Sequence, residues 1–215
     1  TALTGFVETL QGAAANDPVA RERFLAMMAH EADRMARLIG DLLSLSKLQA
    51  SERVAPTDPI NLFNILNSIS SSLSGLADRK NISLKLNFSN CMPTVIGDSD
   101  ELTQVFQNLI ENAIKYSTKE TEVCVSFFPP LEGKSHLCIT VEERGDGIEP
   151  SQIPRLTERF YRVDKGRSRN QGGTGLGLAI VKHILIRHRG WLKISSQVGK
   201  GSVFAVYLPE ASFKS

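Results

Sequence analysis

The segment DSDELTQVFQNLIENAIKY, residues 98–116, is the most informative in the chain, because it reads as a strong helix with an unusual polar face. Two amides, a carboxylate and an ammonium share that face, at spacings of three and four residues: Asn108, Glu111, Asn112 and Lys115. Such groups are poor core material, because each needs a buried partner. Their oxygens suit a hydrated Mg²⁺ that bridges phosphates, and the ammonium suits a phosphate oxygen. An ordinary exposed polar face is the alternative if this helix is considered alone.

Two glycine-rich segments lie further along the chain. Glu143-Arg144-Gly145-Asp146-Gly147-Ile148 follows an expected strand. Its glycines allow a sharp turn close to a flat ligand, although an ordinary turn is the commoner explanation. Gly172-Gly173-Thr174-Gly175-Leu176-Gly177-Leu178 runs directly into an expected helix, so it presents backbone N–H groups to a phosphate. It is neither a Walker A loop nor a dinucleotide fingerprint, and a flexible hinge is the alternative.

The elements around these segments predict a mixed fold. Alternating apolar residues predict strands at 82–88, 122–128, 136–142, 191–195 and 202–208, with a short strand near 93–96. Helical spacing predicts helices at 62–79 and 176–188 besides 98–116. Helices and strands do not alternate strictly. This favours an α+β sandwich with one helical layer on a mixed sheet.

The N-terminal part is expected to be helical. Residues 1–12 have apolar residues at helical spacing, and Asp17-Pro18 is a good start signal for a long helix over about 18–50. A heptad-like apolar stripe follows that helix: Met28, Ala32, Met35, Ile39, Leu42 and Leu45. Periodicity alone leaves two interpretations open, a helix packed on its own domain or a hairpin that dimerises into a four-helix bundle. Residues 51–59 are polar, contain two prolines and read as a boundary.

Bulk composition excludes several classes of protein. The 215-residue chain has a net charge of +2, which argues against a nucleic-acid-binding surface. Cys91, Cys124 and Cys138 lack CxxC pairing, so a zinc site is not expected and a reducing compartment is favoured. No apolar run approaches the roughly 18 to 20 residues that span a bilayer, and no signal peptide is apparent.

Taken in order, the polar helix face and the two glycine segments resemble the N, G1 and G2 boxes of the histidine-kinase ATPase family. Between the last two, Glu158–Asp164 is similar to that family's F box. The run from Ile153 to Lys165 is especially similar to phosphate-regulon sensor kinases. At the other end, Thr1-Ala2-Leu3-Thr4-Gly5-Phe6 resembles the sequence after the histidine-containing H box. By this resemblance the accepting histidine would lie seven residues before Thr1, outside the chain.

The resemblance implies a fold and a domain organisation. Residues 53–215 would form a catalytic domain, a two-layer α/β sandwich of the Bergerat-type ATP-binding fold shared with gyrase-type ATPases. Residues 1–52 would be part of an antiparallel helical hairpin for dimerisation and histidine phosphotransfer. The family then implies a homodimer, a response-regulator receiver domain as partner, no nucleic-acid partner, and a cytoplasmic catalytic part of a membrane-anchored parent protein.

The same resemblance implies site roles and the cofactors ATP and Mg²⁺. Asn112, with Asn108, would bind Mg²⁺, while Glu111 would support the metal and the phosphates, and Asn108, Glu111 and Lys115 would form the catalytic set. Lys115 would contact phosphate and Tyr116 the adenine or ribose. Residues 150–173 would form a mobile lid, with Arg162 and either Arg167 or Arg169 reaching phosphates. The remaining nucleotide contacts would come from Glu143, Gly145, Gly147, Ile148, Phe160, Gly173, Thr174, Gly175, Leu176, Gly177 and Leu178.

One position departs from the family pattern. The G1 box normally begins with Asp, which accepts a hydrogen bond from the adenine amine, whereas this chain has Glu143. The extra methylene displaces the acceptor, and a misplaced contact costs about 1 to 3 kcal/mol. We therefore expect weaker nucleotide binding, or an adjusted pocket, relative to an Asp-bearing relative.

None of the four histidines is expected to be the acceptor. His30 lies on the second expected hairpin helix and lacks the Leu-Arg-x-Pro that follows the acceptor in the family. His136, His183 and His188 are expected at the surface or in packing. Two other functions stay open: a pseudokinase that dimerises without phosphotransfer, favoured by Glu143, and another ATPase of the same fold, such as a serine-directed anti-sigma kinase or a gyrase-type enzyme.

Overall fold

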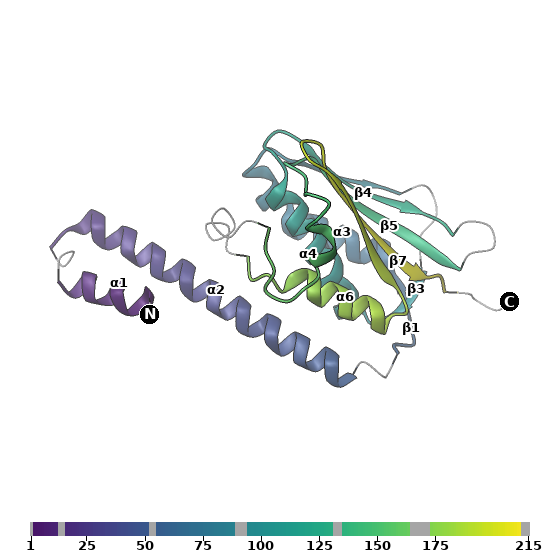
Figure 1. Ribbon diagram of the computed structural model, residues 1–215, viewed down its shortest axis with the longest axis horizontal. Coiled ribbons are helices and arrows are strands. Elements are labelled where there is room, and N and C mark those ends of the chain that lie inside the picture. Colours follow the sequence, from purple (N-terminus) through teal and green to yellow (C-terminus); the bar gives the residue numbers. More distant parts are fainter. Residues whose placement is uncertain are drawn as a thin grey trace.

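The computed structural model describes residues 2–12, 16–51, 55–88, 94–130, 135–163 and 173–211 (Figure 1). Two helices, α1 (Ala2–Gln11) and α2 (Pro18–Ser51), form a hairpin that extends away from an α/β part. The α2 helix begins where expected, because the Asp17 carboxylate accepts hydrogen bonds from the N–H groups of Val19 and Ala20. The rings of Phe6 and Phe24 lie 6.0 Å apart and hold the two helices together.

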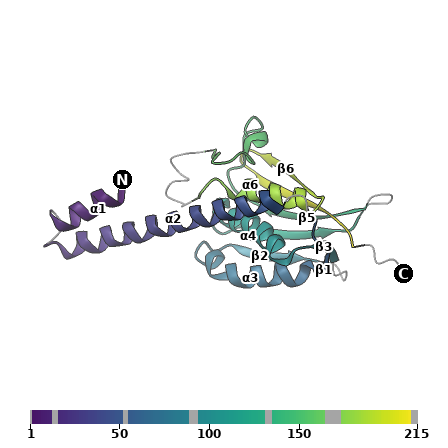
Figure 2. The same cartoon turned by 90° about the horizontal axis from the view of Figure 1, so that it is seen from below.

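The α/β part is a two-layer sandwich. Its sheet has the order β2 (Ser83–Asn87), β4 (Glu122–Phe128), β5 (His136–Glu143), β7 (Gly201–Pro209) and β6 (Trp191–Gln197). The β2 and β4 strands are parallel, and the other neighbours are antiparallel. Three helices cover one face: α3 (Leu62–Asp78), α4 (Ser99–Tyr116) and α6 (Gly177–Arg187) (Figures 1 and 2). The predicted α+β sandwich with one helical layer is confirmed.

The orientation of α4 follows from its apolar face. Leu102, Phe106, Leu109 and Ile110 are fully buried against the sheet and the neighbouring helices. Burying such side chains contributes about 1.5 to 3 kcal/mol each, so this face has to point inward. The polar face of α4 lies at a fixed angle around the helix axis from this apolar face. It is therefore directed to the end of the sandwich where β5 and α6 also present their glycine segments.

A strand that the sequence did not predict precedes α3. β1 (Asp58–Asn61) pairs antiparallel with β3 (Thr94–Gly97) in a separate two-stranded sheet. Residues 51–59 were expected to be only a boundary, because Pro59 and its polar neighbours do not alternate like a strand. Proline is tolerated here because each strand of a two-stranded sheet has a free edge. A 3-10 turn, η1 (Ile153–Arg155), is the one regular element described within residues 144–163.

The α2 stripe divides between two environments. Leu45 and Leu48 are only 3% and 5% exposed, because this end of the helix packs on the α/β part beside α6. Ser44 Oγ also donates a hydrogen bond of 3.0 Å to Gln104 Oε1 of α4. Met35, Ile39 and Leu42, by contrast, stay 46%, 57% and 47% exposed. The helix thus packs on its own chain at one end and leaves the middle of the stripe, from Ala32 to Leu42, exposed.

Neither a membrane-spanning helix nor a metal-binding cluster was expected from the sequence, and the structure bears on both only for the residues that it describes. Among the described helices, none combines the length and the apolar character that a membrane span requires. The described residues include no group of three or more His, Cys, Asp and Glu side chains suited to a metal ion. Cys124 and Cys138 are free thiols, and Cys91 lies outside the described residues.

Candidate functional site

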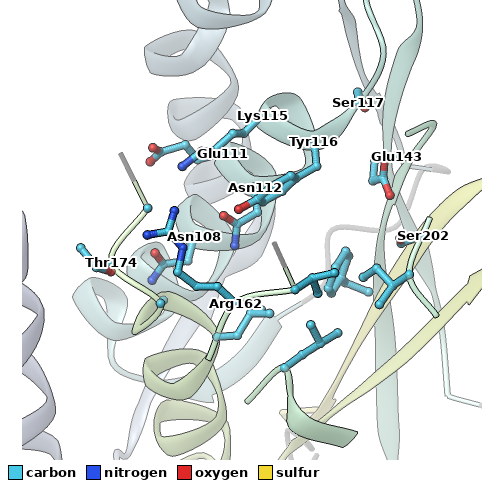
Figure 3. A pocket seen from close by; sticks show the side chains of 18 of the residues that line it. Asn108, Glu111, Asn112, Lys115, Tyr116, Ser117, Glu143, Arg162, Thr174 and Ser202 are labelled. Atoms are coloured by element: carbon cyan, nitrogen blue, oxygen red, sulfur yellow. The ribbon is translucent and has the colours of Figure 1, made fainter. Parts of the chain in front are cut away.

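A cavity of about 760 Å³ opens at the end of the sandwich where α4 finishes. Its walls are the polar face of α4, the turn after β5, residues 156–163, the glycine segment before α6, one end of β7 and the middle of α2. Figure 3 shows Glu143, Ser117 and Ser202 at one end of the cavity and Thr174 and Asn108 at the other. Asn112 and Tyr116 of α4 lie between these groups.

The α4 wall carries a concentrated positive charge at Lys115. Burial is the main reason that the pKa of Lys115 lies below its ordinary value. The Glu111 carboxylate opposes that shift, whereas the nearby cations Arg37, Arg162 and Lys80 add to it. An anion bound among these cations would relieve their mutual repulsion. This part of the cavity is therefore suited to a negatively charged group.

The opposite end of the cavity is built around a buried carboxyl group. Glu143, the last residue of β5, is 4% exposed, and burial raises the pKa of its carboxyl group. The hydroxyl and N–H of Ser202 on β7, and the N–H of Gly145, partly offset that effect. Among the described residues, the Oε2 atom of Glu143 has no hydrogen-bond partner. A buried acceptor without a hydrogen-bond partner favours the binding of a ligand that carries a hydrogen-bond donor.

The glycine segment joins the positively charged end. Gly175 has a φ of +75°, and a Cβ there would come within 3.0 Å of the Phe160 backbone, so only glycine fits without strain. A Cβ on Gly173 would lie 3.2 Å from Lys115 Nζ. The α6 helix that follows has no side-chain cap on Leu176. Its first N–H groups are thus suited to an anion at the cavity.

The segment before the undescribed residues 164–172 contributes Arg162. Its Nη2 atom is buried and has no hydrogen-bond partner among the described residues. A backbone hydrogen bond of 2.9 Å from Phe160 N to Gly175 O holds this segment against the glycine segment. Arg155 stacks over the Tyr161 ring at 4.2 Å. These contacts place a guanidinium with unused donors beside Lys115.

Most of the residues singled out from the sequence line this one cavity. They are Asn108, Glu111, Asn112, Lys115, Tyr116, Glu143, Gly147, Ile148, Arg162, Gly173, Thr174, Gly175, Gly177 and Leu178. Asn112 and Gly175, which are far apart in the sequence, thus face the same space. The cavity brings the polar helix face and both glycine segments together.

Three of the predicted residues do not line it. Leu176 is fully buried in the core, and Phe160 is 58% exposed at the surface. Gly145 lies behind the cavity, where a Cβ would come within 2.3 Å of the Tyr116 carbonyl oxygen. These residues shape the walls rather than form the cavity surface. Arg167 and Arg169 lie outside the described residues.

Several residues that line the cavity were not predicted from the sequence. Arg37 and Asp41 come from α2, and Ser202 and Phe204 come from β7. In the sequence, Arg37 and Asp41 are simply part of the polar face of a helix, and such a face usually lies in solvent. Ser202 could have been found from pairing, because it lies opposite Glu143 in the β5–β7 ladder, but the sequence does not reveal which strands are neighbours.

The chemistry of the cavity fits a nucleotide with a divalent cation. Amide and carboxylate oxygens from Asn108, Glu111 and Asn112 are hard donors of the kind that Mg²⁺ accepts. The unused donor of Arg162 and the cations near Lys115 fit phosphates, and the unused acceptor of Glu143 fits an exocyclic amine.

Comparisons with known proteins agree with this arrangement. The family model described as "Histidine kinase-, DNA gyrase B-, and HSP90-like ATPase" matches residues 97–212, and the model described as "His Kinase A (phospho-acceptor) domain" matches residues 1–51. The phosphate regulon sensor protein PhoR of Pseudomonas aeruginosa is 40% identical over 98% of this chain and 47% of its own length. The sensor-like histidine kinase SenX3 of Mycolicibacterium smegmatis is 40% identical over 92% of this chain and 50% of its own length.

Solved structures show the same architecture. Full-length ShkA in complex with AMPPNP is 25% identical, with a TM-score of 0.73 over 89% of this chain and 39% of that one. The Acinetobacter baumannii histidine kinase AdeS is 22% identical and shares the fold, with a TM-score of 0.73 over 99% of this chain and 96% of its own. The chain spans about half the length of the curated relatives it matches.

Proposed function

This chain belongs to the sensor histidine kinases, and from that premise we propose that its cavity binds ATP with Mg²⁺ and supports phosphoryl transfer to a histidine. The γ-phosphorus would form a bond to a histidine imidazole nitrogen as its bond to the bridging β–γ oxygen breaks, and ADP would leave. The phosphoryl group would then pass to an aspartate of a response regulator. The accepting histidine would belong to the longer protein.

The cavity walls hold three buried side-chain atoms without a hydrogen-bond partner among the described residues, namely Ser117 Oγ, Glu143 Oε2 and Arg162 Nη2, and the last two carry this proposal. Glu143 Oε2 is a buried acceptor at the end near β7, and Arg162 Nη2 is a buried donor at the end near Lys115. Leaving either atom without a partner costs about 1 to 3 kcal/mol. A molecule with an amine at one end and anionic oxygens at the other satisfies both. Adenosine phosphates have this polarity.

The chain's own residues take the roles that the family resemblance implies. Asn112, with Asn108, would hold Mg²⁺, and Glu111 would support the metal and the phosphates. The bound ion would neutralise charge on the phosphates as the bond to the leaving oxygen breaks. Lys115 and Arg162 would bind phosphate oxygens, and Tyr116 would lie against the adenine or ribose. In this class of reaction catalysis is mainly positioning and charge neutralisation.

A reconstituted phosphotransfer assay tests the activity. The chain is mixed with a separate hairpin that carries the family's acceptor histidine and with γ-labelled ATP. Acid-labile, base-stable label on that hairpin supports the proposal. The absence of label, with ATP still bound, would favour a pseudokinase, for which the departure at Glu143 is the specific observation. Acid-stable phosphoserine would favour another ATPase of this fold.

The assembly is also a proposal. We assign residues 1–52 to a partial dimerisation and phosphotransfer hairpin and residues 53–215 to the catalytic domain. The match of residues 1–51 to a phospho-acceptor model and the open stripe on α2 support a homodimer through the hairpin. A receiver domain is the expected partner. We propose that the catalytic part is cytoplasmic and that the parent protein is anchored in the membrane.

A further inference from the structure

The α2 helix forms part of the cavity wall, although it belongs to the hairpin rather than to the sandwich. Arg37 and Asp41 of α2 both line the cavity. Asp41 Oδ2 accepts a hydrogen bond of 2.6 Å from Thr174 Oγ1, across 133 residues of sequence. Leu45 and Leu48 bury the adjoining turns of the helix, so Asp41 is held at this place. A carboxylate therefore stands at the end of the cavity where Figure 3 shows Thr174.

This contact uses the one proton that the Thr174 hydroxyl can donate. Its hydroxyl donates to Asp41 and accepts a hydrogen bond of 3.2 Å from Leu176 N. A hydroxyl has one proton to donate, so Thr174 cannot also donate to a phosphate while it is bonded to Asp41. The Leu176 N–H, which leads into α6, is likewise engaged. The contact with α2 thus ties up one donor of the glycine segment, the Thr174 hydroxyl.

The charge of Asp41 acts in the same direction. The cations around Lys115 attract phosphates, whereas the Asp41 carboxylate in the same wall repels them. Coulomb repulsion between unit charges grows with each phosphate added and is only partly screened in a half-buried wall. The penalty is then largest for a triphosphate and absent for a nucleoside. Arg37 lines the same wall and offsets part of this repulsion for every charged ligand, so the repulsion by Asp41 is measured by removing the Asp41 charge alone.

We propose that Asp41 determines the selectivity of the site for the number of phosphates, and that its hydrogen bond to Thr174 competes with a nucleoside triphosphate. The inference rests on the proposed ATP site. Because coupling between two binding events is reciprocal, displacement of α2 from Thr174 strengthens triphosphate binding, and the triphosphate weakens the hold of α2. Asp41 is a specificity-determining residue in this account.

Calorimetric titration of the whole chain with adenosine, AMP, ADP and ATP at fixed Mg²⁺ tests the proposal. The Asp41→Asn variant keeps an acceptor for Thr174 and removes the charge. It is expected to bind ATP about three- to tenfold more tightly, ADP less so, and adenosine unchanged. Raising the salt concentration is expected to reduce the gain. The matched control is Asp33→Asn, which removes the same charge from an exposed position of the same helix outside the cavity wall.

Each outcome has one meaning. If wild type binds ATP but Asp41→Asn binds it equally or more weakly, the inference is wrong. It is also wrong if Asp41→Asn raises the affinity for adenosine as much as the affinity for ATP, or if Asp33→Asn raises the affinity for ATP as much as Asp41→Asn does. If wild type binds none of the four ligands, the proposed function itself fails. In a second variant, Asp41→Ala, the gain in affinity is again expected to be largest for ATP, smaller for ADP and absent for adenosine. Thermal melts of all variants show whether they are folded.

Discussion

Glu143 shows how a single residue departs from the family pattern and is accommodated. Its longer side chain reaches Ser202 on the neighbouring strand, which the sequence alone could not place. The hydroxyl and N–H of Ser202 favour the charged form of the carboxyl group and so lower its pKa, yet Oε2 has no hydrogen-bond partner among the described residues. Glu143 therefore offers an available acceptor at this end of the cavity. The effect of its extra methylene on nucleotide affinity stays a prediction.

Shortening this side chain tests the effect of the extra methylene. We expect Glu143→Asp to bind ATP more tightly than wild type by about 1 kcal/mol, since the acceptor would regain the usual family position. Calorimetric titration measures this difference. Glu142→Asp, the same change at the exposed adjacent position of β5, is the control. Equal affinities of Glu143→Asp and wild type would show that the Ser202 contact already compensates for the longer side chain.

His188 is a second residue whose environment has a measurable consequence. The ring is 3% exposed, its Nε2 accepts a hydrogen bond of 3.0 Å from Asp98 N, and its Nδ1 lies 2.8 Å from Ile184 O. Burial lowers the pKa of His188, although the Ile184 carbonyl and the Glu101 carboxylate oppose the shift. The ring, which follows the last residue of α6, thus connects α6 to Asp98, the N-cap residue of α4.

The lowered pKa of His188 predicts a loss of stability in acid. In the unfolded chain His188 takes up a proton near pH 6.5, whereas in the folded chain it takes up the proton only at lower pH. The contribution of His188 to the free energy of unfolding is therefore complete above about pH 6.5 and declines as the pH falls below that value. The slope is at most about 1.4 kcal/mol per pH unit. Denaturant unfolding of His188→Phe is expected to show lower stability at neutral pH and a flatter acid limb. His30→Gln, at an exposed position, should keep the wild-type slope; a wild-type slope in His188→Phe would contradict the account.

At this scale, the sequence predicts residues whose relationship is local. Asn108 and Lys115 were found together because helix geometry places them on one face. Asp41 could not be found, because its partner Thr174 is brought to it only by the packing of α2 on the sandwich. Phe160 and Leu176 belong to motifs that do contribute to the cavity, but neither side chain lines it. Whether a side chain is exposed or buried depends on tertiary packing, which a motif does not specify.

The end of α4 depends on a side chain from another element. Lys80, just after α3, donates from Nζ to the carbonyl oxygens of Ile114 at 3.0 Å and Ser117 at 3.4 Å, and also to that of Lys115. An ammonium at a helix C-terminus satisfies unpaired carbonyls and interacts favourably with the helix dipole. Lys80 thus fixes the turn that carries Lys115 and Tyr116 into the cavity.

Removal of this ammonium should affect both stability and binding. Lys80→Met keeps the side-chain length, and we expect it to lower the free energy of unfolding by about 1 to 2 kcal/mol. ATP affinity should fall several-fold as the last turn of α4 loosens. Chemical denaturation and calorimetry measure the two effects, with Lys193→Met at an exposed position of β6 as control. Unchanged ATP affinity in Lys80→Met would show that the turn is held without the lysine.

Whole elements were predictable where a local pattern defines them. β4 was expected at 122–128 and has those bounds, because its apolar residues alternate without interruption. β1 was missed, because Pro59 removes the usual signal and the strand exists only through its pairing with β3. The order of strands, including the parallel pairing of β2 with β4, depends on long-range contacts rather than on local periodicity.

For the molecule as a whole, the open part of the α2 stripe predicts self-association. Met35, Ile39 and Leu42 expose apolar surface on one side of a long helix, which suits a hairpin dimer. We expect wild type to be a dimer by light scattering and the double variant Ile39→Glu, Leu42→Glu to be a monomer that still binds ATP. Ala26→Glu adds a charge to the opposite side of the helix and should remain a dimer. A monomeric wild type would remove the proposal of a hairpin dimer.

The continuity of α2 has a mechanical meaning. The helix is a single element of 34 residues, about 51 Å long at 1.5 Å per residue, and contains no internal proline. Such a helix is one continuous rod from Pro18 to the turns that pack on the sandwich. An axial twist applied near Pro18, at the end remote from the sandwich, would swing the Asp41 carboxylate around the rod and away from Thr174. Rotation at one end of the molecule would thereby become a change in electric field at the other.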